Sequence, residues 1–468
     1  MNQNETDTSP TQLWASLPID SAQQANLAAL GFAGMTPVQA ATLPISLAGG
    51  DVIAQAKTGS GKTAAFAIPL LQKLNIASLK VQALVLCPTR ELADQVCAEI
   101  RRLARAYENV KVLPLCGGVA LRGQTASLEN GAHIVVGTPG RVLDHLQREN
   151  LSFDALNTLV LDEADRMLDM GFADDIQAIA KQSPASRQTL LFSATYPDTI
   201  AALSARLMRQ AQMVKVDTTH DTHAIDEWFF EVEPDTRLDA VTRLLSHYQP
   251  ASTVAFCNTR VQCNDLVQIL RAHGFSALTL HGDLDQRDRD QVLIQFANQS
   301  CSVLVATDVA ARGPDIAELA AVINVDTTPD PQVYTHRIGR TGRAGATGLA
   351  LSLVTMSEMS RVARIEEANN RPSRWAKLSE LSSKGGALKA PMRTLQIAGG
   401  RKEKIRAGDI LGALTGEAGF DKAQIGKISL GEFSSYVAVS ADIATPAMDA
   451  LNAGRIKGKR VKVRLLDN

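Results

Sequence analysis

The sequence predicts an α/β protein with two tandem parallel-sheet domains and a small C-terminal α+β domain. From residue 14 to residue 216, short apolar runs rich in β-branched residues alternate with longer mixed stretches. The same rhythm restarts after a polar stretch at 217–226. Continuous apolar runs that end in polar or glycine residues are typical of parallel strands buried on both faces, with crossover helices between them. Beyond residue 393 the order of elements changes, which predicts a third and different domain.

The composition excludes several classes of protein. Of the 468 residues, 45% are hydrophobic and 21% are charged, which is ordinary for a globular chain of about three domains. Lysine and arginine total 48 against 49 acidic residues, so any basic surface has to be local. The six cysteines form no C-x-x-C pair, which disfavours disulfides and structural zinc. Because we find no signal-peptide pattern and no run of about 18 apolar residues, we expect a cytoplasmic protein with no membrane partner.

The composition also indicates domain boundaries. We expect a disordered N-terminus at 1–13, α/β domains at 14–216 and 227–381, and an RNA-binding domain at 394–468. The linkers are the polar stretch at 217–226 and a stretch at 382–393 rich in Ser, Gly, Lys and Pro. The candidate strands of the two α/β domains are residues 52–55, 83–88, 134–137, 159–161, 190–192, 253–256, 277–280, 303–306, 321–325 and 350–354.

A phosphate-binding loop follows the first candidate strand. The run Ala56-Lys57-Thr58-Gly59-Ser60-Gly61-Lys62-Thr63 has the spacing of a P-loop, with Ala56 where the first glycine usually stands. Small residues let backbone N–H groups surround a phosphate at a helix N-terminus. We expect Lys62 to reach the β- and γ-phosphates of ATP and Thr63 to bind Mg²⁺. The predicted nucleotide-binding residues of the loop are Thr58, Gly59, Ser60, Gly61, Lys62 and Thr63.

A pair of carboxylates ends another candidate strand. In Leu159-Val160-Leu161-Asp162-Glu163-Ala164-Asp165, an apolar strand delivers Asp162, which we expect to hold Mg²⁺, partly through water. Glu163 is placed to position or deprotonate the attacking water. Acids also favour helix N-termini, where the macrodipole stabilises them. The phosphate-binding loop upstream favours the catalytic interpretation.

The run Asp162-Glu163-Ala164-Asp165 resembles the signature of the DEAD-box RNA helicases, and the rest of that family's motif series follows in order. The resemblance implies two RecA-like domains and RNA-stimulated ATP hydrolysis coupled to local unwinding of short RNA duplexes. Thr36-Pro37-Val38-Gln39 is similar to the family's adenine-reading element. It implies that Gln39 bonds the adenine edge and that Trp14, where the family usually has Phe, stacks on the base.

Three further runs of the first domain resemble the family's contacts with the RNA backbone. Helix N-termini, Thr hydroxyls and Arg side chains suit phosphate and sugar oxygens, which carry no sequence information. Thr89 and Thr138 can also serve as helix caps, and both roles are compatible. Ser193-Ala194-Thr195 is similar to the segment that couples the nucleotide site to strand separation. The implied RNA contacts are Pro88, Thr89, Arg90, Gly118, Thr138 and Arg141.

The second domain has a matching set. In His336-Arg337-Ile338-Gly339-Arg340-Thr341-Gly342-Arg343, the resemblance implies that Arg340 and Arg343 reach the γ-phosphate and that His336 links the two domains near the hydrolysis site. It also implies a ribose contact by Asp315 and RNA contacts by Thr307 and Arg260. Pro314 replaces the family's usual Leu and removes a backbone N–H, which would stiffen that loop.

The C-terminal region reads strand, helix, strand, strand, helix, strand, which resembles an RNA-recognition domain. The DbpA-type branch of the family carries a similar domain, and the resemblance implies large-subunit ribosomal RNA and the pre-ribosomal particle as partners. Tyr436 is the only aromatic on its candidate strand, and residues 395–397 have none. We therefore expect loops and basic edges to bind a folded RNA by shape and phosphate contacts. The cations that we expect to bind RNA are Arg401, Lys402, Lys457, Lys459 and Arg460.

The sequence thus predicts a monomeric, ATP- and Mg²⁺-dependent RNA helicase. One alternative is an ATP-gated RNA clamp or scaffold that remodels RNA–protein complexes without net unwinding. A DNA translocase and a P-loop kinase are further alternatives. A kinase would need neither the arginine pair of the second domain nor Gln39, and the RNA-recognition region disfavours DNA.

Overall fold

The computed structural model describes residues 14–56, 59–216, 225–308, 319–342, 347–382 and 385–466. Residues 1–13, predicted to be a disordered N-terminus, lie outside this part of the chain. The chain divides into two compact units, Met1–Thr219 (unit 1) and His220–Asn468 (unit 2). The described residues form two seven-stranded sheets and one four-stranded sheet. The predicted fold class is confirmed.

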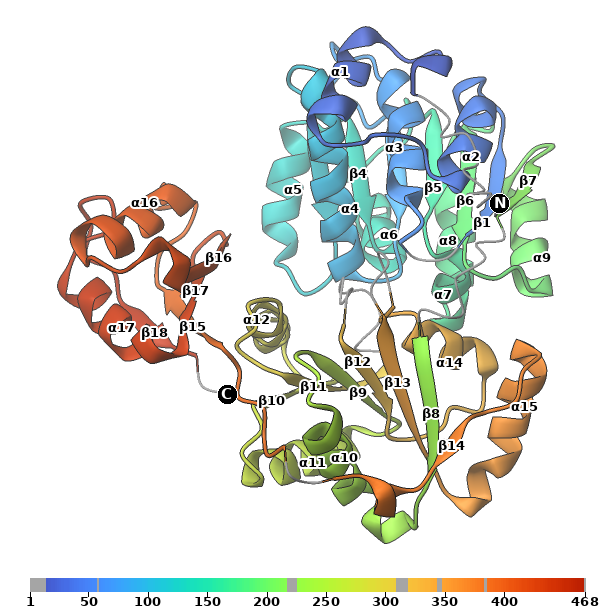
Figure 1. Cartoon of the computed structure of the whole chain (residues 1–468). Helices are drawn as coiled ribbons and strands as arrows, with labels where there is room; N and C mark the ends of the chain where they lie inside the picture. Colours follow the sequence, from blue (N-terminus) through green and yellow to red (C-terminus); the bar gives the residue numbers. More distant parts are fainter. Residues whose placement is uncertain are drawn as a thin grey trace, which may run out of the picture. The chain divides into compact units, whose positions relative to one another are not determined.

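Unit 1 is built on a parallel sheet with the strand order β3-β4-β2-β5-β6-β1-β7 (Figure 1). The central strands are fully buried on both faces, as expected for a parallel sheet covered by crossover helices. The edge strand β7 is largely exposed. The strands are β1 (Val52–Gln55), β2 (Ala83–Leu86), β3 (Val112–Leu115), β4 (Ile134–Gly137), β5 (Thr158–Leu161), β6 (Gln188–Ser193) and β7 (Gln212–Lys215).

Successive residues of these strands face two separate hydrophobic cores. Ala54 and Val85 pack with helices α1 to α4, whereas Ile53 and Leu84 pack with helices α6 to α9. The helices are α1 (Ser21–Ala29), α2 (Pro37–Leu47), α3 (Lys62–Gln72), α4 (Arg90–Leu103), α5 (Leu121–Glu129), α6 (Pro139–Gln147), α7 (Ala164–Asp169), α8 (Ala173–Lys181) and α9 (Asp198–Leu207).

Unit 2 contains a second parallel sheet, with the order β10-β11-β9-β12-β13-β8-β14. Strand β8 begins at Ile225, inside the stretch predicted as a linker. Helices α10 and α11 pack on one face, and α12, α14 and α15 pack on the other. The strands are β8 (Ile225–Glu231), β9 (Thr253–Cys257), β10 (Ala277–Leu280), β11 (Val303–Thr307), β12 (Ala321–Asn324), β13 (Gly348–Val354) and β14 (Trp375–Ala376). The helices are α10 (Arg237–Tyr248), α11 (Arg260–Ala272), α12 (Gln286–Ala297), α14 (Pro331–Ile338) and α15 (Met359–Asn369).

The C-terminal part of unit 2 is a four-stranded antiparallel sheet, ordered β16-β17-β15-β18. Helices α16 and α17 cover one face of this sheet, with a core that includes Leu395, Val437 and Leu451. The chain order of the elements is β15 (Met392–Ile397), α16 (Ala407–Gly412), β16 (Ile425–Leu430), β17 (Ser435–Ser440), α17 (Ala444–Ala453) and β18 (Val463–Leu465). This is the predicted βαββαβ order.

The other face of this small sheet packs against the α12 region of unit 2. Thr394 is fully buried, and its Oγ1 lies 3.1 Å from Asn298 Nδ2 and 2.8 Å from Ser300 Oγ. Tyr436 is also buried, which raises the pKa of its hydroxyl, and that hydroxyl accepts a hydrogen bond from Gln396 Nε2 at 3.3 Å and lies near Gln291 of α12. The surface at Thr394 and Tyr436 is therefore an internal contact of unit 2.

A buried arginine joins three strand ends of the larger sheet in unit 2. Arg337 is 2% exposed, and its Nε and Nη2 each donate to a carboxylate oxygen of Asp308 at 2.7 Å. Its Nη1 donates to the carbonyl of Asp326 at 2.8 Å, and its guanidinium carbon lies 5.1 Å from the ring centre of Phe256. Arg337 thus ties together the segments at the ends of β9, β11 and β12.

We predict that Arg337→Met lowers the urea unfolding midpoint of unit 2. The substitution leaves the Asp308 carboxylate without its bidentate partner, which costs about 3 kcal/mol. Tryptophan fluorescence reports on this unit through Trp228 and Trp375. Arg260→Met is the matched control, because Arg260 pairs with Asp283 on the exposed surface, where an ion pair contributes about 0–1 kcal/mol. Equal midpoints for the two variants would contradict the structural role of Arg337.

Candidate nucleotide and RNA site

Three predicted motifs meet at one edge of the sheet in unit 1. The phosphate-binding loop follows β1, the acidic run follows β5, and Ser193-Ala194-Thr195 spans the end of β6. These strands are neighbours, in the order β5-β6-β1, and all are parallel. Because parallel strands end on the same side, the loops after them lie together, where ligands of such sheets usually bind. Thr58 lies outside the described residues.

Gln39 contacts the phosphate-binding loop. Its Nε2 donates to the Gly61 carbonyl at 3.1 Å, and its Oε1 accepts from the Thr36 N–H at 2.8 Å in a capping box. Gly61 has φ +91°, and a Cβ there would lie 2.6 Å from Gln39 Nε2. A side chain at residue 61 would block this contact, so glycine allows the phosphate-binding loop to lie directly against Gln39.

Two buried charged atoms at this edge have neither a hydrogen bond nor an ion pair among the described residues, unlike Glu163 Oε2, which pairs with Arg166. They are Lys62 Nζ, at the start of α3, and Asp162 Oδ1, immediately after β5. Buried polar atoms are nearly always hydrogen-bonded, so this pair is suited to a bound polar ligand. The set contains an ammonium group for phosphate and a carboxylate for a divalent cation, and therefore fits a Mg²⁺–nucleotide.

Burial raises the pKa of Asp162 to about 6. The Lys62 ammonium opposes this shift, whereas the nearby carboxylates of Glu163 and Asp165 add to it. Glu163 occupies the left-handed region at φ 53° and forms an ion pair with Arg166 at 3.4 Å. A non-glycine residue with this backbone angle at the start of α7 is typical of functional sites.

Asp165 makes a contact that the sequence did not assign. Its Oδ2 accepts hydrogen bonds from the N–H of Thr195 at 3.0 Å and from the Thr195 Oγ1 at 2.9 Å. Its own N–H donates to Ser193 Oγ at 3.3 Å. The acidic run and the Ser-Ala-Thr segment are therefore bonded directly across the β5–β6 pair. The sequence contains both motifs but gives no indication that they are bonded to each other.

Trp14 packs in the core formed by α1 to α4. Its ring lies edge-on to Phe32, with centres 6.0 Å apart, and it is 7% exposed. Its indole Nε1 is buried with no hydrogen-bond partner in the described part of the chain.

The predicted RNA contacts of unit 1 lie along the other half of the same sheet edge, after β2, β3 and β4. Thr89 caps α4, accepting from the Leu92 N–H, whereas the Thr138 side chain makes no capping bond to α6. Arg141 Nη1 donates to the Val119 carbonyl at 3.0 Å and so holds the loop of Gly118. Pro88 lies between β2 and α4, and Arg90, the first residue of α4, pairs with Asp94 at 3.6 Å. The residues predicted to bind the nucleotide and those predicted to bind RNA thus lie on two halves of one sheet edge.

The predicted residues of unit 2 are described in part. His336 is in α14, Arg340 follows that helix and is nearly buried, and Thr307 ends β11. Arg260, at the start of α11, binds both oxygens of Asp283 at 2.7 and 2.6 Å. Arg343 and Asp315 lie outside the described residues, as does Pro314.

Cations from separate loops converge at one end of the C-terminal domain. Lys457 Nζ donates to the Lys404 carbonyl at 2.6 Å, and Lys459 Nζ donates to the Glu403 carbonyl at 3.2 Å. These side chains join the loop at 399–406 to the loop at 455–460. We call the following exposed residues the basic loop cluster: Arg401, Lys402, Lys404, Lys457, Lys459 and Arg460.

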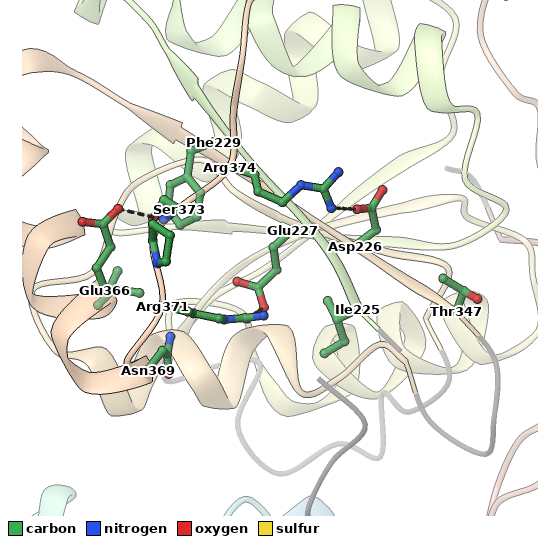
Figure 2. Close-up of a pocket in the computed structure, with 12 residues that line it drawn as sticks. Ile225, Asp226, Glu227, Phe229, Thr347, Glu366, Asn369, Arg371, Ser373 and Arg374 are labelled. Carbon is green, nitrogen blue, oxygen red and sulfur yellow. Dashed lines mark hydrogen bonds and ion pairs between the residues drawn. The ribbon is translucent and has the colours of Figure 1, made fainter. Parts of the chain in front are cut away.

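A cavity of about 420 Å³ in unit 2 lies at the other end of its large sheet, beside the first residue of β8 and the end of α15 (Figure 2). Its charges pair with each other. Glu227 forms an ion pair with Arg371, and Asp226 lies 2.7 Å from Arg374. Because these pairs satisfy one another, the cavity offers less to a charged ligand than the edge containing Lys62 and Asp162.

Comparison with known proteins identifies the family. The DEAD/DEAH box helicase model matches residues 36–203, the helicase conserved C-terminal domain matches 236–345, and the DbpA RNA binding domain matches 394–465. The chain belongs to the DEAD-box helicase family. It is an ATP-dependent RNA helicase with a DbpA-type RNA-binding domain, so the predicted family and enzyme class are confirmed.

Relatives and solved structures agree with this assignment. The chain is 53% identical to ATP-dependent RNA helicase DbpA of Escherichia coli K12, over 95% of this chain and 97% of that protein. It is 46% identical to DEAD-box ATP-dependent RNA helicase CshA of Geobacillus kaustophilus, over 67% of each chain. A structure of Dbp5 of S. cerevisiae bound to RNA and ADP BeF3 is 28% identical with a TM-score of 0.72, covering 79% of this chain and 96% of that one. None of the helices within the described ranges is long and apolar enough to cross a membrane.

We predict that the contribution of Asp162 to the stability of this DEAD-box helicase falls as the pH rises from about 4 to about 6. In this range the folded chain retains a proton on Asp162 that the unfolded chain, with the ordinary value of 3.8, has lost. Above about pH 6 the folded state must hold the buried carboxylate in its charged form, at a cost of up to about 3 kcal/mol.

The measurement is the urea unfolding midpoint of the parent and of Asp162→Asn at several pH values without nucleotide. Asn has the same size but does not titrate, so the parent midpoint is expected to fall more between pH 4 and pH 6.5 than the variant's. Parallel pH profiles for the two chains would contradict the raised pKa.

Proposed function

We propose that this helicase couples RNA-stimulated hydrolysis of Mg²⁺–ATP to local unwinding of short duplexes in large-subunit ribosomal RNA during ribosome assembly. The observation that carries the nucleotide part is the unpartnered buried pair, Lys62 Nζ and Asp162 Oδ1, on one sheet edge. The buried ammonium of Lys62 and the buried carboxylate of Asp162, on the same sheet edge, are matched to the charges of a Mg²⁺–triphosphate.

The nucleotide would be held by the phosphate-binding loop, with Lys62 on the β- and γ-phosphates. Thr63 and Asp162 would hold Mg²⁺, partly through water, and the cation when bound neutralises charge on the phosphate oxygens. Glu163 would orient the attacking water and accept its proton. Gln39 would bond the adenine edge, Trp14 would stack on the base, and Asp315 would bind the ribose. Thr58, Gly59, Ser60 and Gly61 would surround the phosphates with backbone N–H groups.

Unit 2 would complete the reaction. Arg340 and Arg343 would supply positive charge to the γ-phosphate, and His336 would link the two units while both act on one nucleotide. RNA bound to both units would favour that state and so stimulate hydrolysis. The RNA backbone would be held by Pro88, Thr89, Arg90, Gly118, Thr138, Arg141, Arg260 and Thr307.

The C-terminal domain would direct the enzyme to its RNA. Anchoring the catalytic units beside one RNA raises their effective concentration near the duplexes around it. The basic loop cluster and the similarity to DbpA support large-subunit ribosomal RNA and the pre-ribosomal particle as the targets. We further propose that residues 14–216, 227–381 and 394–468 work as one monomeric enzyme in the cytoplasm.

We predict that Lys62→Ala and Glu163→Gln each reduce RNA-stimulated ATP hydrolysis by at least about a thousandfold, for different reasons. Loss of the Lys62 ammonium removes a phosphate ligand, so binding of a fluorescent ATP analogue falls as well. Glu163→Gln keeps the shape of the site but cannot accept the proton, so nucleotide binding remains. Steady-state phosphate release and fluorescence titration check the two effects, and normal turnover in either variant would refute the assignment.

We predict that a triple variant, Lys457→Glu with Lys459→Glu and Arg460→Glu, loses the preference of the enzyme for large-subunit ribosomal RNA. Each phosphate-bound cation contributes about one unit to the slope of log affinity against log salt concentration. The triple variant is therefore expected to bind ribosomal RNA with a slope smaller by up to about three, while stimulation of its ATP hydrolysis by poly(U) persists.

Lys422→Glu with Lys427→Glu is the control, since both lysines are exposed on the same domain outside the cluster. An unchanged salt slope in the triple variant would rule out the cluster as the RNA anchor.

A further inference from the structure

The C-terminal domain lacks an open aromatic surface on its sheet. Domains of this topology commonly stack bases on aromatic side chains of the central strands. Here this face of β15 and β17 is covered by a contact with the α12 region, in which Thr394 bonds Asn298 and Ser300 and Tyr436 lies near Gln291. Base stacking at this face would require that contact to open.

One aromatic side chain of this domain is open to solvent. Phe433 lies between β16 and β17 and is 60% exposed, and it is the only large hydrophobic residue at 394–466 with such exposure. The Lys402 Nζ lies 4.2 Å from the centre of its ring. The same ammonium pairs with Glu432 at 3.1 Å, so the cation over the ring is itself held.

The loop that carries Phe433 is fixed to the loop of Arg401 and Lys402. The Arg401 N–H donates to the Gly431 carbonyl, and the Lys402 N–H donates to the Glu432 carbonyl, both at 3.0 Å. A Cβ at Gly400 would lie 2.5 Å from the Gly431 carbonyl oxygen, so this approach needs glycine. The ring therefore has a set position relative to the basic loop cluster.

The other loop of the cluster, at 455–460, is equally constrained. Ile456 and Lys459 exchange backbone hydrogen bonds of 2.9 and 3.1 Å across a turn whose central residues, Lys457 and Gly458, both have positive φ. The buried Ile456 anchors this turn in the domain core. The cluster presents six cations, against the carboxylates of Glu403 and Glu432 in neighbouring loops and of Asp409 at the start of α16. The excess of positive charge beside an open ring is suited to one ligand class, RNA.

We propose that Phe433 is a base-stacking residue: its open ring takes one unpaired nucleobase of a folded RNA whose adjacent phosphates are bound by the basic loop cluster. The proposal rests on the proposed RNA-anchoring function of that cluster. The ligand is a nucleotide in a loop, a bulge or a single-stranded end, because a base inside a duplex has no free face. Phe433 then supplies selectivity for unpaired nucleotides, and the cations supply affinity that does not depend on sequence.

The test uses the full chain and RNA hairpins taken from large-subunit ribosomal RNA, with 2-aminopurine at each unpaired position in turn. Stacking on an aromatic side chain quenches this base analogue. We expect the parent chain to quench one position, and Phe433→Leu to abolish that quenching and weaken hairpin binding about tenfold. Phe433→Tyr, which retains an aromatic ring, is expected to behave like the parent.

The salt dependence of binding and ATP hydrolysis stimulated by poly(U) distinguish a loss of stacking from a loss of charge contacts or of activity. Phe433→Leu removes no charge, so the slope of log affinity against log salt and the ATP hydrolysis stimulated by poly(U) are expected to match the parent. The thermal midpoint is also expected to be unchanged, because the side chain is exposed.

The outcomes distinguish this proposal from the function on which it rests. If the triple charge reversal weakens hairpin binding but Phe433→Leu binds and quenches like the parent, the stacking role is wrong and the anchor stands. If neither variant weakens binding, or the parent binds none of the hairpins, the anchor and the stacking role both fail.

Discussion

The burial of Lys62 and Asp162 beside one another is the constraint on which the catalytic edge depends. Removing a charge from water costs several kcal/mol, and neither Lys62 Nζ nor Asp162 Oδ1 recovers this cost through a hydrogen bond to the described residues. Their mutual attraction offsets part of it, yet burial still raises the pKa of Asp162 to about 6. The fold must therefore stabilise two buried charges whose desolvation is not fully offset. A ligand that carries both phosphate and a cation would offset the remaining cost.

The parallel sheet makes this possible and also divides the edge. The strands β1, β5 and β6 end at the half proposed to bind the nucleotide, whereas β2, β3 and β4 end at the half proposed to bind RNA. The hydrogen bonds that Thr195 donates to Asp165 run across the β5–β6 pair, so a shift of the acidic run has to move the Ser-Ala-Thr segment with it. This gives the acidic run and the Ser-Ala-Thr segment, which lie in the same half of the edge, a direct physical connection.

The sequence predicted most interior strands of both large sheets and the edge strand β10, but not the edge strands β3, β7 and β14 or the interior strand β8. Strands such as β2 and β4 are continuous apolar runs because both faces are buried, and they were recognisable for that reason. The edge strand β7 is largely exposed, β3 contains Pro114, and β8 begins Ile225-Asp226-Glu227, so none has that pattern. The motifs likewise indicated which residues gather, since strand ends in a parallel sheet meet. The sequence did not predict the partners of individual side chains. Nothing in the residues near Arg337 shows that its ion-pair partner is Asp308, which follows another strand.

The small sheet of the C-terminal domain shows how one packing contact accounts for an unusual composition. A strand face that binds bases needs aromatic rings, but a face that packs against polar groups of α12 and the following turn needs hydrogen-bonding side chains of moderate size. Thr394 and Gln396 meet that need, with Thr394 bonded to Asn298 and Ser300 and Gln396 bonded to Tyr436 and Arg464. The scarcity of aromatics on β15 is thus a consequence of intramolecular packing. The same contact leaves the loop end of the domain, with its cations, facing solvent.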